Sequence, residues 1–204
     1  ADCAAAIAAY RSRLPAVVAL VKAIAIAELE AGGKYVEARH DPLFARYTED
    51  SLTPADLALT PDYLVCIPPE RNDAPENAAL LDMLSAGMPA KVLVQVSDLL
   101  EESSIGTGHY ACGVRSARLA TTAMGLGGMF VLQCASSALA ALKPRVERGM
   151  ACRGPALFTV FAGSPHPAAG LPRYLTAAAA LESRAFPAFT YDAAAGDNWA
   201  TRFS

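Results

Sequence analysis

The residues best suited to chemistry lie in one long segment between two apolar runs. Ser97 to His109 contains three carboxylates, three serines and the turn Gly106-Thr107-Gly108. A carboxylate such as Asp98 can bind a cation, and successive backbone N–H groups in a glycine turn can bind a phosphate. The turn lacks the third glycine of a dinucleotide-binding motif and the lysine of a P-loop. A cation or phosphate site and a plain surface loop are therefore both open interpretations.

The histidines and cysteines form no recognisable catalytic or metal-binding pattern. His109 could act as a general acid or base only if the fold brought Asp98 or Glu101 close to it, and a solvated loop histidine is the simpler interpretation. His40 and His166 lie at or near prolines and are expected in turns. The five cysteines are far apart and lack zinc-binding spacing. We expect them to be small, buried side chains in a reducing compartment.

Three short apolar runs are predicted to be buried parallel strands that position these loops. They cover residues 91–96, 129–134 and 156–161. Segments 113–126 and 136–149 have the length of crossover helices and end at or near glycine. The pattern predicts a βαβαβ core with right-handed crossovers, in which ligand-binding loops gather at the carboxyl edge of the sheet.

Flanking segments predict further elements. The strongest helix signal runs from Leu14 to Leu29, with Pro15 in the first turn, and its apolar arc is so wide that we expect burial between layers or against a neighbouring subunit. Residues 34–60 are interpreted as an irregular connector with a short helix from about Pro54 to Leu59. The other predicted elements are a strand over 62–68, a helix over 74–87, a helix over 172–183 and a strand starting near Phe186.

The length of 204 residues predicts one α/β domain. We expect a three-layer fold with a mostly parallel sheet of about five strands and helices on both faces. Residues 1–61 would be an N-terminal helical segment and connector, and residues 62–192 the α/β core. Residues 193–204 would be a tail that docks back on the body.

Composition argues against two classes of partner. The net charge is −3 with scattered basic residues, so we expect no nucleic-acid partner. The longest apolar stretch, residues 14–29, carries two charges and is shorter than the roughly 20 residues that span a bilayer, so we expect no membrane association. These features predict a cytoplasmic protein. Because the sequence begins without methionine, it is interpreted as a fragment of a longer one.

The order and spacing of several segments resemble the thiamine-diphosphate-binding domain of pyruvate (2-oxoacid):ferredoxin oxidoreductases. The resemblance covers about residues 62–192 and rests on segments 81–87, 91–94, 119–125, 130–132, 154–158 and 186–192. It implies that thiamine diphosphate and Mg²⁺ are the cofactors, held at the carboxyl edge of the sheet. In that family a Gly-Asp-Gly turn follows one strand and an asparagine-containing loop follows the next.

The cofactor motifs diverge from this family pattern. Pro69-Glu70-Arg71 stands at the Gly-Asp-Gly position, so Glu70 alone keeps a carboxylate for the metal. The asparagine-containing loop falls within residues 102–108, where asparagine is absent but the Gly106-Thr107-Gly108 turn is similar. The resemblance therefore implies Glu70, Asp98 and this turn as the cofactor-binding residues, and Glu70 as the metal ligand.

The family places a cysteine ligand of its iron–sulfur cluster after the last core strand, where this chain has Gly163-Ser164. We therefore expect no iron–sulfur cluster within the chain. If a cation is still bound, Glu70 should converge with Asp98, Glu101 or Glu102. If the site is vestigial, Glu70 should pair with a nearby cation such as Arg71 or face water.

The resemblance predicts part of a 2-oxoacid:ferredoxin oxidoreductase-like enzyme with a degenerate metal-binding motif. We expect other domains or subunits of an oxidoreductase complex as partners, an oligomeric assembly, and an isolated chain without activity. The alternative is a non-catalytic scaffold or subunit-interface module of a larger complex. A third hypothesis is an enzyme that uses a different ligand at the long loop.

Overall fold

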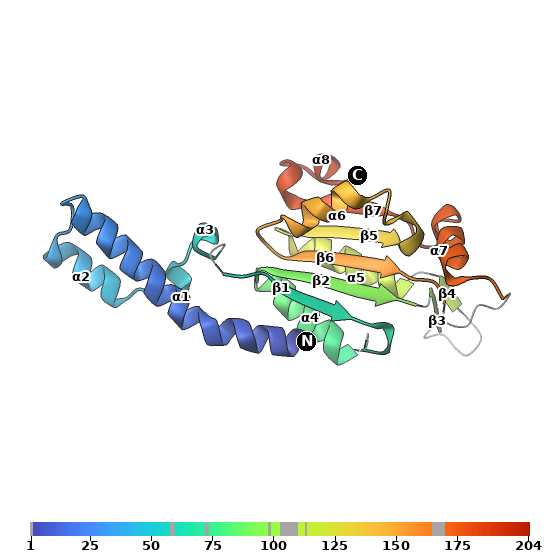
Figure 1. The fold of residues 1–204 in the computed structure, drawn as a ribbon, viewed down its shortest axis with the longest axis horizontal. Helices are drawn as coiled ribbons and strands as arrows, with labels where there is room; N and C mark the ends of the chain where they lie inside the picture. Colours follow the sequence, from blue (N-terminus) through green and yellow to red (C-terminus); the bar gives the residue numbers. More distant parts are fainter. Residues whose placement is uncertain are drawn as a thin grey trace.

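A five-stranded sheet forms the centre of the protein (Figure 1). The computed structural model describes residues 2–57, 60–71, 74–97, 99–102, 110–112, 114–164 and 170–204. The strand order is β1-β2-β6-β5-β7, in which β1, β2, β6 and β5 are parallel and β7 is antiparallel to β5. The strands are β1 (Tyr63–Ile67), β2 (Ala90–Val96), β5 (Phe130–Ala135), β6 (Ala156–Phe161) and β7 (Phe189–Asp192). The predicted three-layer, mostly parallel α/β fold is confirmed.

Helices lie on both faces of this sheet and beyond its ends (Figure 1). The α-helices are α1 (Cys3–Ala31), α2 (Glu37–Ala45), α3 (Pro54–Leu57), α4 (Ala74–Ser85), α5 (Val114–Leu126), α6 (Lys143–Met150), α7 (Arg173–Glu182) and α8 (Trp199–Arg202). Short 3₁₀ turns are η1 (Glu49–Ser51), η2 (Pro69–Arg71), η3 (Ser136–Ala138) and η4 (Ala193–Ala195). Helices α4 and α5 cover one face, and α6 lies on the opposite face over β5 and β6.

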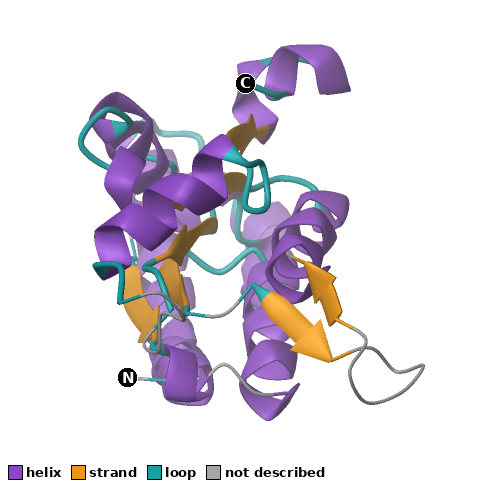
Figure 2. Ribbon diagram, turned by 90° about the vertical axis from the view of Figure 1, so that its right-hand side faces the viewer, coloured by secondary structure: helices purple, strands orange, loops and turns teal. Residues whose placement is uncertain are grey.

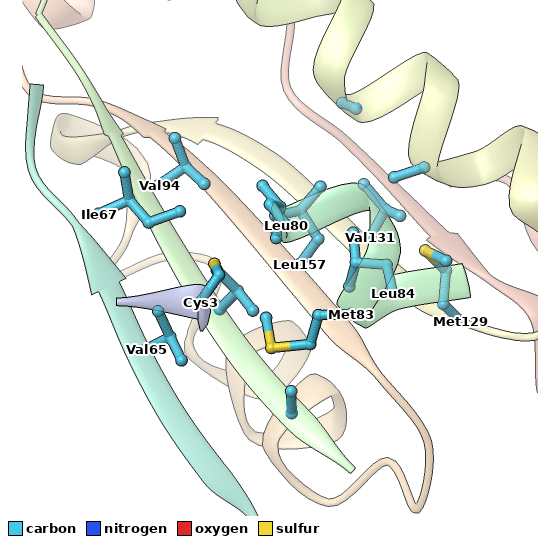
Figure 3. Packing of buried hydrophobic residues seen from close by; sticks show 14 of the residues in the cluster. Cys3, Val65, Ile67, Leu80, Met83, Leu84, Val94, Met129, Val131 and Leu157 are labelled. Carbon is cyan, nitrogen blue, oxygen red and sulfur yellow. The ribbon is translucent and has the colours of Figure 1, made fainter. Parts of the chain in front are cut away.

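The largest hydrophobic cluster joins α1, α4 and α5 to one face of the sheet (Figure 3). Cys3 of α1 and Met83 of α4 meet the strand side chains Val65, Val92 and Leu157, all of which are 0–1% exposed. Burial of one such aliphatic side chain contributes roughly 1.5–3 kcal/mol. The start of α1 is therefore anchored in the core.

Most local predictions are confirmed. The runs 62–68, 91–96 and 156–161 form β1, β2 and β6, and helices α4 and α7 occupy the predicted segments. Gly87 and Gly127 follow helices with φ of +66° and +73°, a left-handed conformation that favours glycine at a helix end.

The tail also docks on the body as predicted. Trp199 lies against Tyr191 with ring centroids 5.2 Å apart, and Phe203 lies 5.3 Å from Phe189. The backbone of Ser204 exchanges two hydrogen bonds with Thr190, at 2.6 and 2.9 Å. The end of the tail therefore pairs with β7.

The first helix differs from the prediction. It begins at Cys3 instead of near Pro15, because the carboxylate of Asp2 accepts a hydrogen bond from the N–H of Ala5 and caps it there. Pro15 lies inside the helix. Within the chain, only Cys3, Ala6 and Val21 of α1 are buried, so most of its apolar surface is exposed.

The connector is more regular than predicted. Residues 37–45 form α2, which contains Pro42, and His40 is helical instead of lying in a turn. The Nδ1 atom of His40 accepts a hydrogen bond from the N–H of Val36, which caps the start of α2. The predicted short helix is α3, over 54–57, while residues 58–59 lie outside the described part.

Two elements in the second half of the core also differ. The single helix predicted over 136–149 is the 3₁₀ turn η3 followed by α6 from Lys143, because Pro144 is suited to the first turn of a helix. The last strand begins at Phe189, after Pro187, and runs antiparallel to β5 instead of parallel. The long segment after β2 also forms strands that the sequence did not predict, since β3 (Leu100–Glu102) and β4 (Tyr110–Cys112) pair as an antiparallel ribbon.

Candidate functional site

The carboxyl ends of three adjacent strands meet at one edge of the sheet. The register aligns Ile67 of β1 with Val94 of β2 and Thr159 of β6, and β2 and β6 end together at Val96 and Phe161. The segments after these strands therefore emerge side by side, as ligand-binding loops do in open parallel sheets. Figure 2 looks onto this edge, from which the β3–β4 ribbon projects.

Glu70, the proposed metal ligand, lies in the 3₁₀ turn η2 directly after β1. Its side chain is exposed. Within the described part of the chain, no group of three or more His, Cys, Asp or Glu residues is arranged to bind a metal ion. The turn places a single carboxylate in solvent, which fits poorly with the several oxygen ligands that a hard divalent cation requires.

Arg71, the neighbour of Glu70, joins three elements at this edge. Its Nη2 atom lies 3.1 Å from Oδ2 of Asp2 and 3.7 Å from Oε2 of Glu76 at the start of α4. The N–H of Cys3 donates to Oε1 of Glu76 at 2.8 Å. The start of α1 is therefore fixed to the carboxyl end of β1 by charge-assisted hydrogen bonds.

This network shifts the protonation of two side chains. The N–H of Ala5 and then the Arg71 guanidinium lower the pKa of Asp2 below its usual value. Burial and then the hydrogen bond with Glu76 raise the pKa of the Cys3 thiol to about 12. Cys3 is therefore a protonated, buried thiol at neutral pH, which is unsuited to nucleophilic chemistry.

The other predicted cofactor-binding residues, Asp98, Gly106, Thr107 and Gly108, lie outside the described residues. His109 and His166 lie outside them as well. Leu99 is described, and it packs against a cluster at the carboxyl end of the sheet that includes Val96, Phe161 and Phe186. An apolar side chain from the predicted ligand loop thus contributes to the core.

Gly163 lies two residues after the end of β6, at the position where the resemblance places the cluster-binding cysteine of the family. Its φ is +83°, and an added Cβ would lie 2.3 Å from the carbonyl oxygen of Arg173. Only glycine fits this position, because both the backbone conformation and the close approach of α7 exclude a side chain. The departure from cysteine is therefore compatible with a structural requirement at this edge.

Two buried polar side chains lie in one row of the sheet. Thr159 and Gln133 are aligned on neighbouring strands and are 0% exposed. The amide of Gln133 donates to the carbonyl of Pro187 at 3.0 Å, whereas its Oε1 and the hydroxyl of Thr159 have no hydrogen-bond partner. Neither residue was among the predicted site residues, although a polar residue within an apolar run is a signal that marks both in the sequence.

At the opposite, amino end of the sheet, Lys91 is a buried cation. Its side chain is 1% exposed, and Nζ donates to the carbonyls of Cys152 and Gly154 and lies 3.3 Å from the carboxylate of Asp62. These groups satisfy the three donors of the ammonium group. Lys91 therefore links β2 to the loop before β6 and has a structural role.

Among the described residues, no helix covers the face of β1 and β2 that points away from α4. Figure 1 shows no helix across these strands on the near side, where α6 lies over β5. Leu64 is 65% exposed and Leu93 is 39% exposed on this face, and Cys66, which is aligned with Leu93 in the register, is exposed as well. We call Leu64, Cys66 and Leu93 the open face.

A groove of about 310 Å³ continues the open face towards α6. Its lining is almost entirely apolar and consists of Leu93, Gln95, Leu139, Val146, Met150, Phe158, Val160 and Ala162. None of these described lining residues is charged. Its chemistry suits an apolar partner surface better than a polar substrate.

The sequence matches no protein-family model and no curated protein significantly. The helices of the described residues all fall short of the length and apolar character required to cross a bilayer. Function is therefore inferred from the residues and contacts of this chain.

Proposed function

We propose that this chain is the thiamine-diphosphate-domain-like module of a larger 2-oxoacid:ferredoxin oxidoreductase-like assembly, and that it serves there as an interface module. The observation that carries this proposal is the open face of β1 and β2. Its role is to pack against a neighbouring domain or subunit. The chemistry of the assembly then depends on sites that the neighbour supplies or completes.

The burial along β1 and β2 supports this role. Parallel strands are normally covered on both faces, whereas Leu64 of β1 and Leu93 of β2 are exposed on the outward face. Full burial of an exposed leucine contributes roughly 1.5–3 kcal/mol, of which Leu64 has the larger part still to gain and Leu93 the smaller part. Contiguous apolar patches are uncommon on proteins that act alone, so the open face favours a partner.

The state of the candidate metal site also favours an interface role over catalysis. The Arg71 guanidinium lies beside Glu70 in the chain and is engaged by Asp2 and Glu76. The carboxylates of Asp2 and Glu76 are thus engaged by a cation of the protein itself, which disfavours their joining Glu70 as ligands of a divalent cation. Glu70 itself is exposed, as expected for a vestigial site.

Binding of the fluorescent dye 8-anilinonaphthalene-1-sulfonate at low micromolar protein tests the open face. We expect the native chain to bind the dye, and Leu64→Thr together with Leu93→Thr to reduce the fluorescence clearly, while the exposed apolar side of α1 retains the remainder. The melting temperature should fall only slightly, because both leucines are partly exposed, Leu64 to 65% and Leu93 to 39%. Tyr174→Thr, at a 63% exposed position on α7, is the matched control and should leave the fluorescence unchanged. Unchanged fluorescence in the double variant would refute the interface role.

A second candidate function is the binding of thiamine diphosphate by this chain. The observation in its favour is the common edge at which β1, β2 and β6 end, since cofactors of open parallel sheets bind there. Thermal unfolding with millimolar thiamine diphosphate and Mg²⁺ separates the two functions. The interface proposal predicts a shift below about 1 °C, whereas a ligand at 100 times its Kd adds about 2.7 kcal/mol and shifts the transition by several degrees.

If a shift occurs, Glu70→Gln identifies its source. Loss of the shift in that variant would assign the cofactor site to this edge and contradict the vestigial interpretation of Glu70. Asp82→Gln, on the exposed side of α4, serves as the matched control for removal of one carboxylate.

A further inference from the structure

A second uncovered apolar surface lies on α1. The helix contacts the body near its start, where Tyr10 meets Tyr63 with ring centroids 6.0 Å apart, and then extends beyond the sheet (Figure 1). We call residues 16–31 of α1 the arm. Leu20 is 54% exposed and Ile24 is 44% exposed on the arm.

The exposed flank of the arm carries no charge over three turns. The exposed residues of the arm before Glu28 are Ala16, Ala19, Leu20, Ala23, Ile24 and Ala27. Val21 is 7% exposed, so the arm buries a different flank against its own chain. The flank with Leu20 and Ile24 is therefore unpaired in one copy of the protein.

The arm and the open face cannot meet within one chain. Cys3 and Ala6 anchor α1 on the covered side of the sheet, and the arm runs away from the strands (Figure 1). The flank of the arm and the three residues of the open face are uncharged. Lys91, on the same face of β2, is buried and already paired with Asp62, so contact between the two surfaces leaves this cation paired. Two copies of the chain can cover both surfaces, whereas a different partner on the open face leaves the arm exposed.

We propose that two copies of this chain form a dimer in which the arm of each copy lies across the open face of the other. This proposal rests on the interface role proposed above and names a second copy as the partner. The exchange is reciprocal, so a two-fold axis relates the copies and the assembly closes.

The dimensions of the two surfaces agree. The flank from Ala16 to Ala27 is about 18 Å long at 1.5 Å per residue. Strand β2 has seven residues and is about 23 Å long. The two uncovered strands are together about 10 Å wide, which matches the diameter of one helix with its side chains.

The area determines how strong the dimer is. One contact of about 18 by 10 Å is too small to hold two proteins together, because specific interfaces bury more than roughly 1,000 Å² in total. Two reciprocal contacts bury roughly 700–1,000 Å² across their four surfaces, at the low end where complexes are weak. The dimer should therefore form over roughly 10–300 μM.

Analytical ultracentrifugation of the whole 204-residue chain tests the proposal. The mass should rise with concentration from 21.2 kDa to about twice that value. Leu20→Glu on the arm and Leu64→Glu on the open face should each give a monomer at all concentrations. Leu43→Glu on α2, where the leucine is 55% exposed, is the matched control for Leu20 and should dimerise like the native chain. Thermal unfolding verifies that each variant is folded.

Mixing the two monomeric variants makes the test specific for exchange. For this mixture the arm variant is Leu20→Lys, which should also be monomeric alone. Paired with Leu64→Glu, it forms one native contact and one contact in which the introduced lysine meets the introduced glutamate, so the mixture should associate more than either variant alone. A Leu20→Lys, Leu64→Glu double variant should recover association through opposite charges in both contacts.

Three results would overturn the exchanged dimer. A native chain that stays monomeric throughout the range excludes a second copy, but it leaves the dye-binding test of the interface role unaffected. Dimerisation of Leu64→Glu with loss only in Leu20→Glu assigns the contact to paired arms. A mixture that associates no more than its components excludes reciprocal exchange.

Discussion

The two faces of the sheet differ in burial at β1, although the same strand contributes to both. On one face Val65 and Ile67 of β1 are 1–2% exposed beneath α1 and α4. On the other face, Leu64, directly before Val65 in the chain, is 65% exposed. All three side chains are aliphatic, so composition does not explain the difference. The position of the helices determines which apolar residues form the core and which are available to a partner.

The largest expected effect comes from the covered face. Leu157→Ala, at a 0% exposed position on β6, should lower the free energy of unfolding by about 2–5 kcal/mol, because the cavity cannot collapse among packed neighbours. Urea denaturation monitored by circular dichroism measures it. A loss below about 1 kcal/mol would show that this face is loosely packed and would remove the contrast between the two faces.

The contact of α6 should give the next largest effect. An added Cβ at Gly149 would lie 2.5 Å from Phe130 and 2.7 Å from Phe158, so Gly149→Ala should displace α6 and lower the free energy of unfolding by about 1–3 kcal/mol. Gly125→Ala is the matched control in α5, where no atom lies within 4 Å of the added Cβ. Gly125→Ala should raise the free energy of unfolding by about 0.4–1 kcal/mol. If both substitutions changed the free energy of unfolding in the same direction, the close packing of α6 would be contradicted.

A smaller, pH-dependent effect should come from Asp2, which fixes α1 to the covered side. The pKa of Asp2 is lowered in the folded state, so its contribution to stability is present above its usual value of 3.8 and is lost as the pH falls through the folded-state pKa. The melting temperature of Asp2→Asn should be below that of the native chain at pH 7. The difference should narrow as the pH falls from about 4 towards 2.

Melting curves of both proteins across this pH range provide the measurement. Asp82→Asn, an exposed substitution on α4, controls for the general loss of one negative charge. A difference between the native chain and Asp2→Asn that persists unchanged at pH 2 would show that the effect does not arise from the charge.

The smallest effect is expected on the open face. Leu64→Thr should change the free energy of unfolding by no more than about 0.5 kcal/mol, since an exposed side chain loses little packing and threonine is compatible with a strand. Chemical denaturation at low micromolar protein, below the concentration range proposed for dimerisation, measures the change. A loss comparable to that of Leu157→Ala would mean that Leu64 is buried within its own chain.

The candidate site was only partly predictable. The sequence placed Glu70 after the first strand, and it is there, in an exposed turn. It did not reveal that Arg71 contacts Asp2, because 69 positions separate these residues in the chain. The signal for the helix start was present, since aspartate before a run of alanines is typical of an N-cap, but Pro15 suggested a later start.

By itself the sequence determined the elements whose signals are local. Apolar runs next to glycine and proline specified β1, β2 and β6. Glycines that have positive φ in the structure marked the ends of α4 and α5. Both signals are local, because the length of a run and the steric limits of the backbone act within a few residues. Only the tertiary structure decided the antiparallel direction of β7 and the absence of a helix over Leu64 and Leu93. The direction of β7 and the exposure of these leucines depend on which elements meet in space. An apolar residue in a strand has the same sequence pattern whether its own chain or a partner covers it.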